Sequence, residues 1–232
     1  MSGHSKWSTI KRKKGAADAK RGQVFSKLAK SITVAARLGK NLDMEIAAAK
    51  AANMPKANID RAIKRGTGEL GDGVQIEEIV YEAYGPGGVA ILIKTLTDNR
   101  NRTMGDLRAV ANKFDLRLAE SGSVKYLFDL RGVVVVDSLT EDQQLELIDA
   151  GADDFEIEAD EAVIYMEPTV LHQVQQAVEA LGLKQTEIKI AFVAKNFQTV
   201  DEETQDKVIR VLEALEDLED VDSVETNADL AT

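Results

Sequence analysis

The sequence predicts an α+β protein, with an N-terminal helical domain followed by two α+β domains, the third inserted in the second. Three observations predict this fold. Apolar residues recur at helical spacing before residue 66, and strand-like runs with glycine-rich turns begin at residue 76. Residues 133–200 follow the order β-α-β-β-α-β, which is that of a ferredoxin-like unit.

The first domain is expected to be basic and helical and to include a linker, over residues 1–75. Apolar side chains at three- and four-residue spacing define one hydrophobic face on each helix. We expect helices over 23–38, 43–53 and 56–65. Pro55 separates the last two helices, because proline cannot donate the helical hydrogen bond. Four glycines in GTGELGDGVQ (66–75) indicate the linker.

The second domain is expected to comprise residues 76–132 plus 201–232. The tight turn Gly85-Pro86-Gly87-Gly88 separates two apolar runs, which indicates a hairpin. We expect strands over 76–84, 89–96, 124–130 and 221–226, and helices over 101–114 and 201–218. The last helix and strand follow the ferredoxin-like unit, so they are expected to return and complete the sheet that begins at residue 76.

The third domain is expected to be an insertion that spans residues 133–200. Its elements alternate in length and period as a ferredoxin-like unit requires. We expect strands over 133–136, 155–159, 162–166 and 187–194, and helices over 141–150 and 169–181. The second helix ends at Gly182, a residue type that commonly follows helix C-termini.

Charge is distributed unevenly along the chain, whose net charge is −11. Residues 1–70 hold 16 Lys and Arg against 5 Asp and Glu, whereas residues 71–232 hold 13 against 35. A surface that only confers solubility mixes its signs along the chain. The segregation therefore predicts a polyanionic partner that the N-terminal end alone contacts.

Several classes of protein are excluded by what the sequence lacks. Without cysteine there is no disulfide, thiolate metal site or cysteine nucleophile, which fits a cytoplasmic location. No apolar run approaches the ~18 residues of a membrane span. The sequence holds no nucleophile–base set, metal cluster or nucleotide motif, so we expect no enzyme, catalytic residue, metal or cofactor. The residues leave the oligomeric state open, with a monomer favoured.

The candidate nucleic-acid-binding residues are mostly cations, because Lys and Arg release counterions from a phosphate backbone. Those of the basic domain are Lys6, Lys11, Arg12, Lys13, Lys14, Lys20, Arg21, Lys27, Lys30, Arg61, Lys64 and Arg65. The alternative for these cations is a solvated charged face. Trp7 joins the candidates because its indole could stack on a base, although it could equally anchor the segment to the core.

The run Asn99-Arg100-Asn101-Arg102 is a second candidate contact, at the start of a predicted helix. Two guanidiniums and two amides there could bind phosphates or bases, aided by the positive end of the helix dipole. The alternative is a capping turn, with Asn101 as the N-cap and Arg100 paired to a nearby carboxylate. The residues alone leave both interpretations open.

Three other motifs favour structural interpretations. The glycine-rich turn at 85–88 lacks the Gly-Lys-Ser/Thr of a phosphate-binding loop, so a hairpin turn is favoured. The run Glu120-Ser121-Gly122-Ser123 could bind or cap, but neither of the two histidines is placed to activate Ser121. The acid pairs Asp153-Asp154 and Asp160-Glu161 could hold Mg²⁺ but are expected to be solvated surface.

Six ordered runs that cover nearly the whole chain resemble the YebC family, which includes the mitochondrial translational activator of cytochrome c oxidase. They are MSGHSKW (1–7), AKAANMPK with IDRAIKRG (49–66), YGPGGV (84–89), LTDNRNRT (96–103), ESGSV (120–124) and LEALEDL (212–218). The resemblance implies a helical domain, an α+β domain and a ferredoxin-like domain inserted in the second. It also implies a DNA-binding transcriptional regulator, or a translation factor on the ribosome.

These observations lead to three functional hypotheses. The first is a nucleic-acid-binding regulator of gene expression that acts on DNA in transcription. The second is a ribosome-associated translation factor or translational activator that contacts RNA. The third is a protein-binding adaptor whose basic domain docks on an acidic partner. DNA is favoured by the family description, yet the residues show neither a clear recognition helix nor an aromatic RNA-binding signature.

Overall fold

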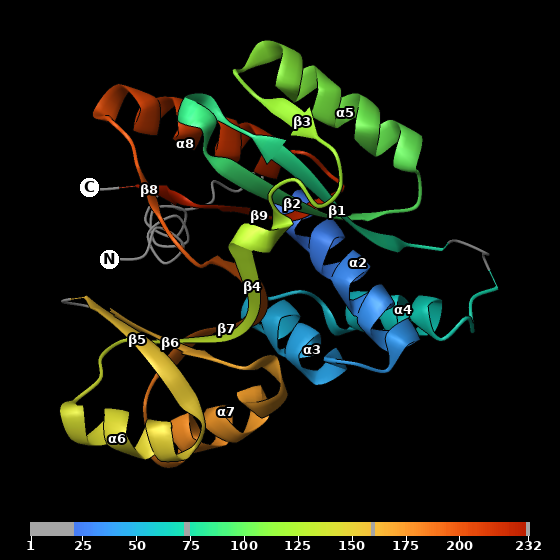
Figure 1. Ribbon diagram of the computed structural model, residues 1–232. Helices are drawn as coiled ribbons and strands as arrows, with labels where there is room; N and C mark the ends of the chain where they lie inside the picture. The colour runs from blue at the N-terminus through green and yellow to red at the C-terminus, as the bar shows by residue number, and fades with distance from the viewer. Residues whose placement is uncertain (1–20, 72–74, 159–160, 231–232) are drawn as a thin grey trace.

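The computed structural model describes residues 21–71, 75–158 and 161–230 as three packed bodies (Figure 1). A group of helices comes first in the chain and is followed by two bodies that each combine a sheet with helices. The predicted α+β class is confirmed, as is the order of a helical unit followed by two sheet-containing units. Each body has its own cluster of buried apolar side chains.

The helical body consists of α2 (Arg21–Leu38), α3 (Leu42–Ala51) and α4 (Lys56–Gly66). Its core contains Ile32 of α2 together with Ala49, Met54, Ile59 and Ala62. The expected helices over this region are therefore confirmed, within a few residues at their ends.

A glycine allows α4 to approach α2 closely. A Cβ added to Gly66 would lie 2.4 Å from the backbone oxygen of Thr33, which no side chain tolerates without movement of the helices. The end of α4 is thus held against the middle of α2.

The middle body is built on an antiparallel sheet with strand order β3-β1-β2-β9. The strands are β1 (Glu77–Tyr84), β2 (Ala90–Thr97), β3 (Arg117–Ala119) and β9 (Val221–Thr226). Helices α5 (Arg100–Lys113) and α8 (Glu202–Glu216) pack on the sheet through the largest apolar cluster (Figure 1). Because β9 pairs with β2, the expectation that the chain end completes this sheet is confirmed.

The hairpin between β1 and β2 turns through Pro86–Gly88 with Gly87 and Gly88 at φ 71° and 77°. Glycine adopts these left-handed values without the steric cost that other residues incur. The interpretation of this run as a hairpin turn is confirmed. Strand β3 and a short parallel pair, β8 (Gln198–Thr199) with β10 (Ala228–Asp229), were not expected from the sequence.

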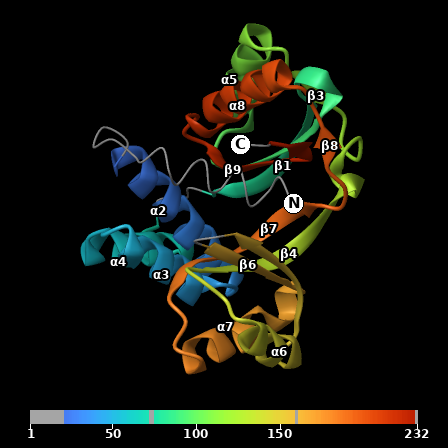
Figure 2. The same ribbon diagram turned by 90° about the vertical axis from the view of Figure 1, so that its left-hand side faces the viewer.

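The third body has the ferredoxin-like strand order β5-β6-β4-β7, with every neighbouring pair antiparallel. Its elements are β4 (Phe128–Val136), α6 (Glu141–Asp149), β5 (Ala152–Glu158), β6 (Glu161–Met166), α7 (Leu171–Ala180) and β7 (Gln185–Ala194). Both helices pack on one face of the sheet, around Val134, Leu147, Ile164 and Val174 (Figure 2). The predicted ferredoxin-like unit, inserted between β3 and α8, is confirmed.

One pair of predicted strands is wrong. Strands were expected over 124–130 and 133–136, but residues 128–136 form the single strand β4. Gly132 does not break the strand, since its missing Cβ makes room for Met166, whose Cγ would lie 2.9 Å from an added Cβ. Val124 precedes a short 3₁₀ turn, Lys125–Leu127, instead of starting a strand. The proposed boundary between residues 132 and 133 falls inside β4, and the division of the chain at that point stays a prediction.

Strands β4 and β7 connect the two sheet-containing bodies. Phe128 and Ala194, at the ends of these strands, pack with Ala90 and Leu92 on the second face of the middle sheet. The ladder between β4 and β7 extends from this cluster into the ferredoxin-like unit. The two sheets therefore share a packed junction (Figure 2).

Candidate nucleic-acid interface

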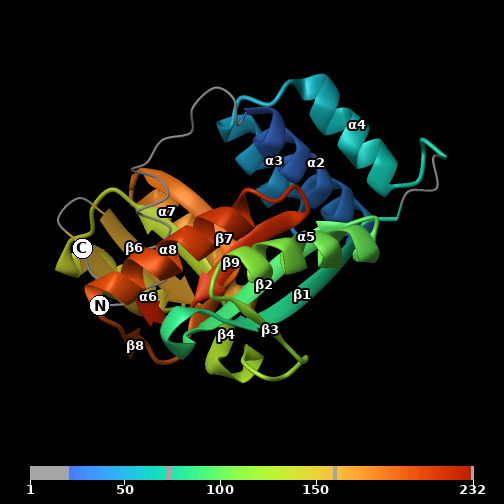
Figure 3. The same ribbon diagram turned by 90° about the horizontal axis from the view of Figure 1, so that it is seen from above.

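Helix α4 presents a row of cations to solvent. Ile59 and Ala62 are buried against α2 and α3, which leaves the opposite side of the helix exposed. At about 100° per residue the exposed side spans Lys56, Lys64, Arg61 and Arg65, with one carboxylate, Asp60, among them. Within the described residues, Lys56, Arg61 and Lys64 form no ion pair. Figure 3 shows α4 at the outer edge of the molecule.

Two predicted contact residues of α2 point toward the middle body instead. Lys30 Nζ lies 2.7 Å from Oδ1 of Asp220, which precedes β9, and Lys27 donates to the backbone carbonyl of Glu216 at the end of α8. Only 16% of the Lys30 side chain is exposed. The expectation that helix α2 displays these cations to phosphates does not fit their positions, because they join the helical body to the middle body.

Asp220 is the centre of this junction. Its carboxylate accepts hydrogen bonds from Arg102 Nη2 at 2.8 Å, Thr103 Oγ1 at 2.8 Å and Thr97 Oγ1 at 3.1 Å, in addition to the Lys30 ammonium. Burial would raise the pKa of this carboxyl, but the hydrogen bonds from Arg102, Lys30 and Thr103 outweigh it and lower the pKa to about 2. The buried side chain, 3% exposed, is therefore an anion with two cationic partners.

A second set of contacts extends the junction. Asp222 accepts from Ser31 Oγ at 3.1 Å, and its carboxylate lies 3.0 Å from the Lys94 ammonium on β2. Glu45 of α3 lies near enough to be affected: burial, followed by repulsion from Asp222, raises its pKa. The pKa of Lys94 is raised as well, because attraction by Asp222 and Glu78 outweighs the effect of burial. This side of α2 and α3 is thus committed to contacts within the protein.

The Asn99–Arg102 run forms a capping turn. The Asn99 side chain accepts from the backbone N–H groups of Asn101 and Arg102, so Asn99 is the N-cap and the expectation of Asn101 in that role is wrong. Arg100 Nε donates to Glu77 at 2.6 Å, as the capping alternative expected, yet 68% of its side chain is exposed. Arg102 is held by Asp220 and Asp98, and these bonds raise its pKa. Of the two guanidiniums, Arg100 is the more accessible.

The larger part of the predicted basic segment lies outside the described residues. This applies to Lys6, Trp7, Lys11, Arg12, Lys13, Lys14 and Lys20. Arg21 is the first residue of α2, and its side chain is not described. The described residues 21–71 alone carry ten Lys and Arg against four Asp and Glu. The helical body is therefore basic even without the preceding segment.

The Glu120–Ser123 run is ordered by a buried carboxylate. Glu82, 3% exposed on β1, accepts from the backbone N–H groups of Gly122, Val124 and Lys125 at 2.6, 2.6 and 2.9 Å. Burial raises the pKa of Glu82, but these three hydrogen bonds outweigh it and lower the pKa overall. The run is a capped loop of the middle body, in agreement with the capping alternative.

The paired acids do not form a metal centre in the described structure. Asp153 pairs with Arg131, and Asp154 accepts from the backbone N–H of Phe155. Within residues 21–71, 75–158 and 161–230, no group of histidine, aspartate and glutamate side chains has the arrangement to hold a metal ion. None of the described helices has an apolar run sufficient to cross a membrane.

Sequence reasoning missed the acids that organise these sites. Asp220, Asp222 and Glu82 look like other members of an acidic chain, and no local pattern distinguishes them. Their partners are up to 190 residues away in the sequence. Only the alternation of β1, which places Glu82 beside the inward Ala83, hints that one of these carboxylates is buried.

Fold and site together define a class, namely α+β proteins that combine a basic three-helix body with a ferredoxin-like unit inserted in a second sheet. Residues 5–69 match the family model described as TACO1/YebC protein N-terminal domain, and residues 76–228 match that of the TACO1/YebC second and third domain. The chain belongs to the TACO1/YebC family.

Relatives and a solved structure agree with this assignment. The chain is 45% identical over 240 residues to a "probable transcriptional regulatory protein" of Syntrophus aciditrophicus, with 99% of this chain and 96% of the relative covered. It is 47% identical over 241 residues to one of Desulfotalea psychrophila, with the same coverage. The crystal structure of the conserved hypothetical protein Aq1575 from Aquifex aeolicus superposes with a TM-score of 0.84 at 42% identity, covering 93% of each chain.

Proposed function

We propose that the protein is a nucleic-acid-binding regulator of transcription that contacts DNA through the exposed face of α4 and the basic segment before α2. The observation that carries this proposal is the exposed cationic face of α4. Lys56, Arg61 and Lys64 project to solvent, whereas Lys27 and Lys30 on α2 are engaged within the protein. Cations in the first position can neutralise phosphates without breaking an existing contact.

The geometry of α3 and α4 supports DNA as the partner. Four residues, 52–55, join the two helices, which is the turn length of helix-turn-helix motifs. Asn53 adopts φ 59° in this turn, in the left-handed region that such tight turns require. In those motifs the second helix enters the major groove. We therefore assign α4 as the groove-facing helix, with Lys56, Asn58 and Arg61 toward the bases or phosphates.

Arg100 is a second phosphate contact in this proposal. Figures 1 and 3 show that α4 and the N-terminal end of α5 lie on the same side of the molecule. The exposed guanidinium of Arg100 stands at that end of α5, where the helix dipole also favours an anion. Its pairing with Glu77 is at the surface, where an ion pair is worth little and a phosphate can compete.

The relatives' names favour transcription, because they are called transcriptional regulatory proteins. The acidic remainder of the chain repels nucleic acid and so orients the helical body toward it. A cytoplasmic, non-enzymatic regulator that acts as a monomer is consistent with this arrangement.

The test compares duplex DNA of mixed sequence with ribosomes and single-stranded RNA, over a salt series. We expect the unmodified protein to bind duplex DNA with a salt dependence that reflects several neutralised phosphates. The variant Arg61→Glu with Lys64→Glu should reduce the slope of log K against log salt by about 0.9 for each phosphate that the protein no longer neutralises. The matched control is Lys184→Glu with Lys207→Glu, which makes the same charge change on exposed side chains of the acidic bodies.

Three outcomes would contradict the proposal. An unchanged salt slope in the α4 variant would show that the interface is elsewhere. Ribosome co-sedimentation at physiological salt, with only weak binding to DNA, would replace transcription with translation. A partner that is captured after nuclease treatment by the unmodified protein, but not by the α4 variant, would indicate a protein-binding adaptor.

A further inference from the structure

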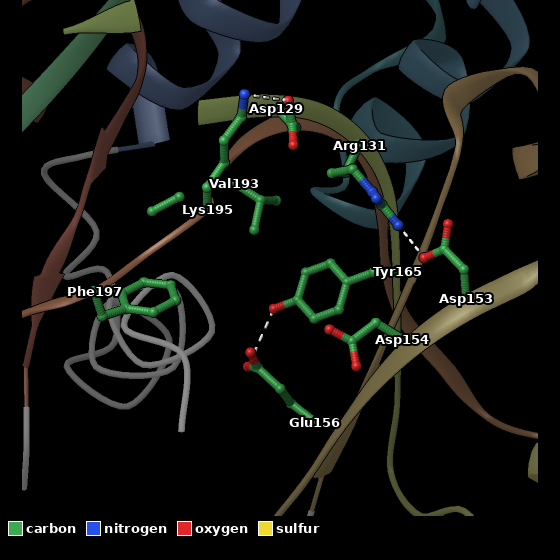
Figure 4. Close-up of a pocket in the computed structure, with 10 residues that line it drawn as sticks. Asp129, Arg131, Asp153, Asp154, Glu156, Tyr165, Val193, Lys195 and Phe197 are labelled. Carbon is green, nitrogen blue, oxygen red and sulfur yellow. Dashed lines mark hydrogen bonds and ion pairs between the residues drawn. The ribbon is translucent and has the colours of Figure 1, made fainter. Parts of the chain in front are cut away.

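The ferredoxin-like unit has a pocket on the face of its sheet that is opposite α6 and α7. Its volume is about 410 Å³, within the range of binding sites. Tyr165 and Val193 line it and belong to an apolar cluster that does not include the two helices. The lining comes from all four strands and from the segment after β7 (Figure 4), and its charged members are Asp129, Arg131, Asp153, Asp154, Glu156 and Lys195.

The charges in this pocket are not balanced, since four carboxylates and two cations line it. Arg131 pairs with Asp153, and Lys195 Nζ lies 3.1 Å from Asp129. The other two carboxylates, Asp154 and Glu156, belong to β5, and Glu156 accepts from the Tyr165 hydroxyl at 3.1 Å. The lining therefore has an excess of negative charge, which lies on its β5 side.

Aromatic rings border the same region. Figure 4 shows the carboxylates of Asp154 and Glu156 beside the Tyr165 ring, with the ring of Phe197 across the pocket. An aromatic face attracts a guanidinium or ammonium group, and a nearby carboxylate adds a charge-assisted hydrogen bond. This combination suits an organic cation carried on an apolar stem.

The pocket also offers a hydrogen-bond donor. The Nε–H of Arg131 is buried and has no acceptor among the described residues, so a ligand with a carbonyl oxygen would satisfy it. A polypeptide provides such an oxygen beside its cationic side chain, whereas a polyamine has none.

We propose that this pocket binds an arginine or lysine side chain of a basic polypeptide partner. Residues 133–200 carry fourteen Asp and Glu against three Lys and Arg, so the surrounding surface attracts a polypeptide with several cations and repels nucleic acid. The site is independent of the nucleic-acid interface, and the inference goes beyond the proposed function. In this arrangement the two ends of the molecule bind partners of opposite charge.

The experiment titrates the nuclease-treated full chain with a labelled arginine–glycine repeat peptide. The variant Asp154→Asn with Glu156→Gln should bind this peptide about tenfold more weakly, because it removes the negative charge of the β5 side. The matched control, Glu146→Gln with Asp149→Asn, makes the same charge change on the exposed side of α6 and should alter binding by less than about twofold. Phe197→Leu should weaken binding too, since it keeps an apolar side chain but removes the ring.

Equal weakening by the pocket variant and the α6 control would overturn the proposal, because it would show attraction by net charge alone. Spermine that competes as well as the peptide would also overturn it, by identifying a free polyamine as the ligand. The α4 variant Arg61→Glu with Lys64→Glu should bind the peptide as the unmodified protein does. Failure of DNA binding therefore leaves this result unaffected, and the two proposals are tested separately.

Discussion

The ammonium of Lys30 on α2 lies 2.7 Å from the carboxylate of Asp220, 190 residues further along the chain. Arg102 on α5 binds the same carboxylate through Nε and Nη2. The helical body is therefore joined to the middle body by one buried anion with two cationic partners. Removal of the anion leaves both cations without compensation, which is the costly way to break a buried pair.

We expect Asp220→Asn to lower the free energy of unfolding by about 2–4 kcal/mol, since it leaves two cations partly buried and unpaired. Urea denaturation followed by circular dichroism measures this change. Asp98→Asn is the control, because Asp98 is 44% exposed and contacts only the Arg102 side of the network. A decrease of about 0.5 kcal/mol or less is expected there. Equal decreases in both variants would show that Asp220 has no special role.

Stability should fall in acid as Asp220 is protonated. Its pKa is depressed to about 2 in the folded protein, below the ordinary value of 3.8. A depressed carboxyl stabilises the fold above its unfolded pKa, and this contribution disappears as the pH falls from about 4 to 2. It amounts to something on the order of 2 kcal/mol. Unfolding measured between pH 5 and pH 2 should therefore show a shallower decline in Asp220→Asn than in the unmodified protein, and parallel curves would contradict this assignment.

Glu82→Gln should open the loop that follows β3. The amide keeps the size of the side chain but lacks the charge that three backbone N–H groups bind, which costs about 1–3 kcal/mol. Hydrogen exchange should accelerate at Gly122, Val124 and Lys125. Glu78→Gln on the same strand, whose side chain is 48% exposed, should leave these amides protected. Unchanged exchange in Glu82→Gln would mean that the loop is held by other contacts.

Two glycines should respond to alanine in opposite directions. Gly66→Ala places a methyl group against the backbone of Thr33 and should destabilise the helical body by about 1–3 kcal/mol. Gly105→Ala lies inside α5 with open space around the new methyl group, so it should stabilise the protein by about 0.5–1 kcal/mol. Thermal unfolding of both variants measures these changes. If Gly66→Ala were neutral, the close approach of α4 to α2 would be incorrect.

The sequence predicted most of the fold because its elements obey local rules. The apolar spacing of α2, α4, α7 and α8 places each helix within a few residues, and the βαββαβ order identifies the ferredoxin-like unit. The split strand was an error of the same local reasoning. Gly132 resembles a break, yet it is an accommodation to Met166, which lies across the sheet on β6.

The candidate site was less accessible to sequence. The excess of cations before residue 70 is visible in the sequence, and it identifies the helical body as the basic end of the molecule. Which cations face solvent depends on partners that are remote in sequence. Lys30 and Arg61 look equivalent on their helices, but Lys30 meets Asp220 whereas Arg61 faces solvent.

Local sequence patterns were thus enough to predict the class of fold, the insertion of one unit in another and the end of the chain that carries positive charge. These properties depend on the identities of neighbouring residues, which a chain states directly. Which charges are neutralised became visible only in the folded chain. A carboxylate acts over a few ångströms of space, and folding alone brings Asp220, Asp222 and Glu82 to their partners.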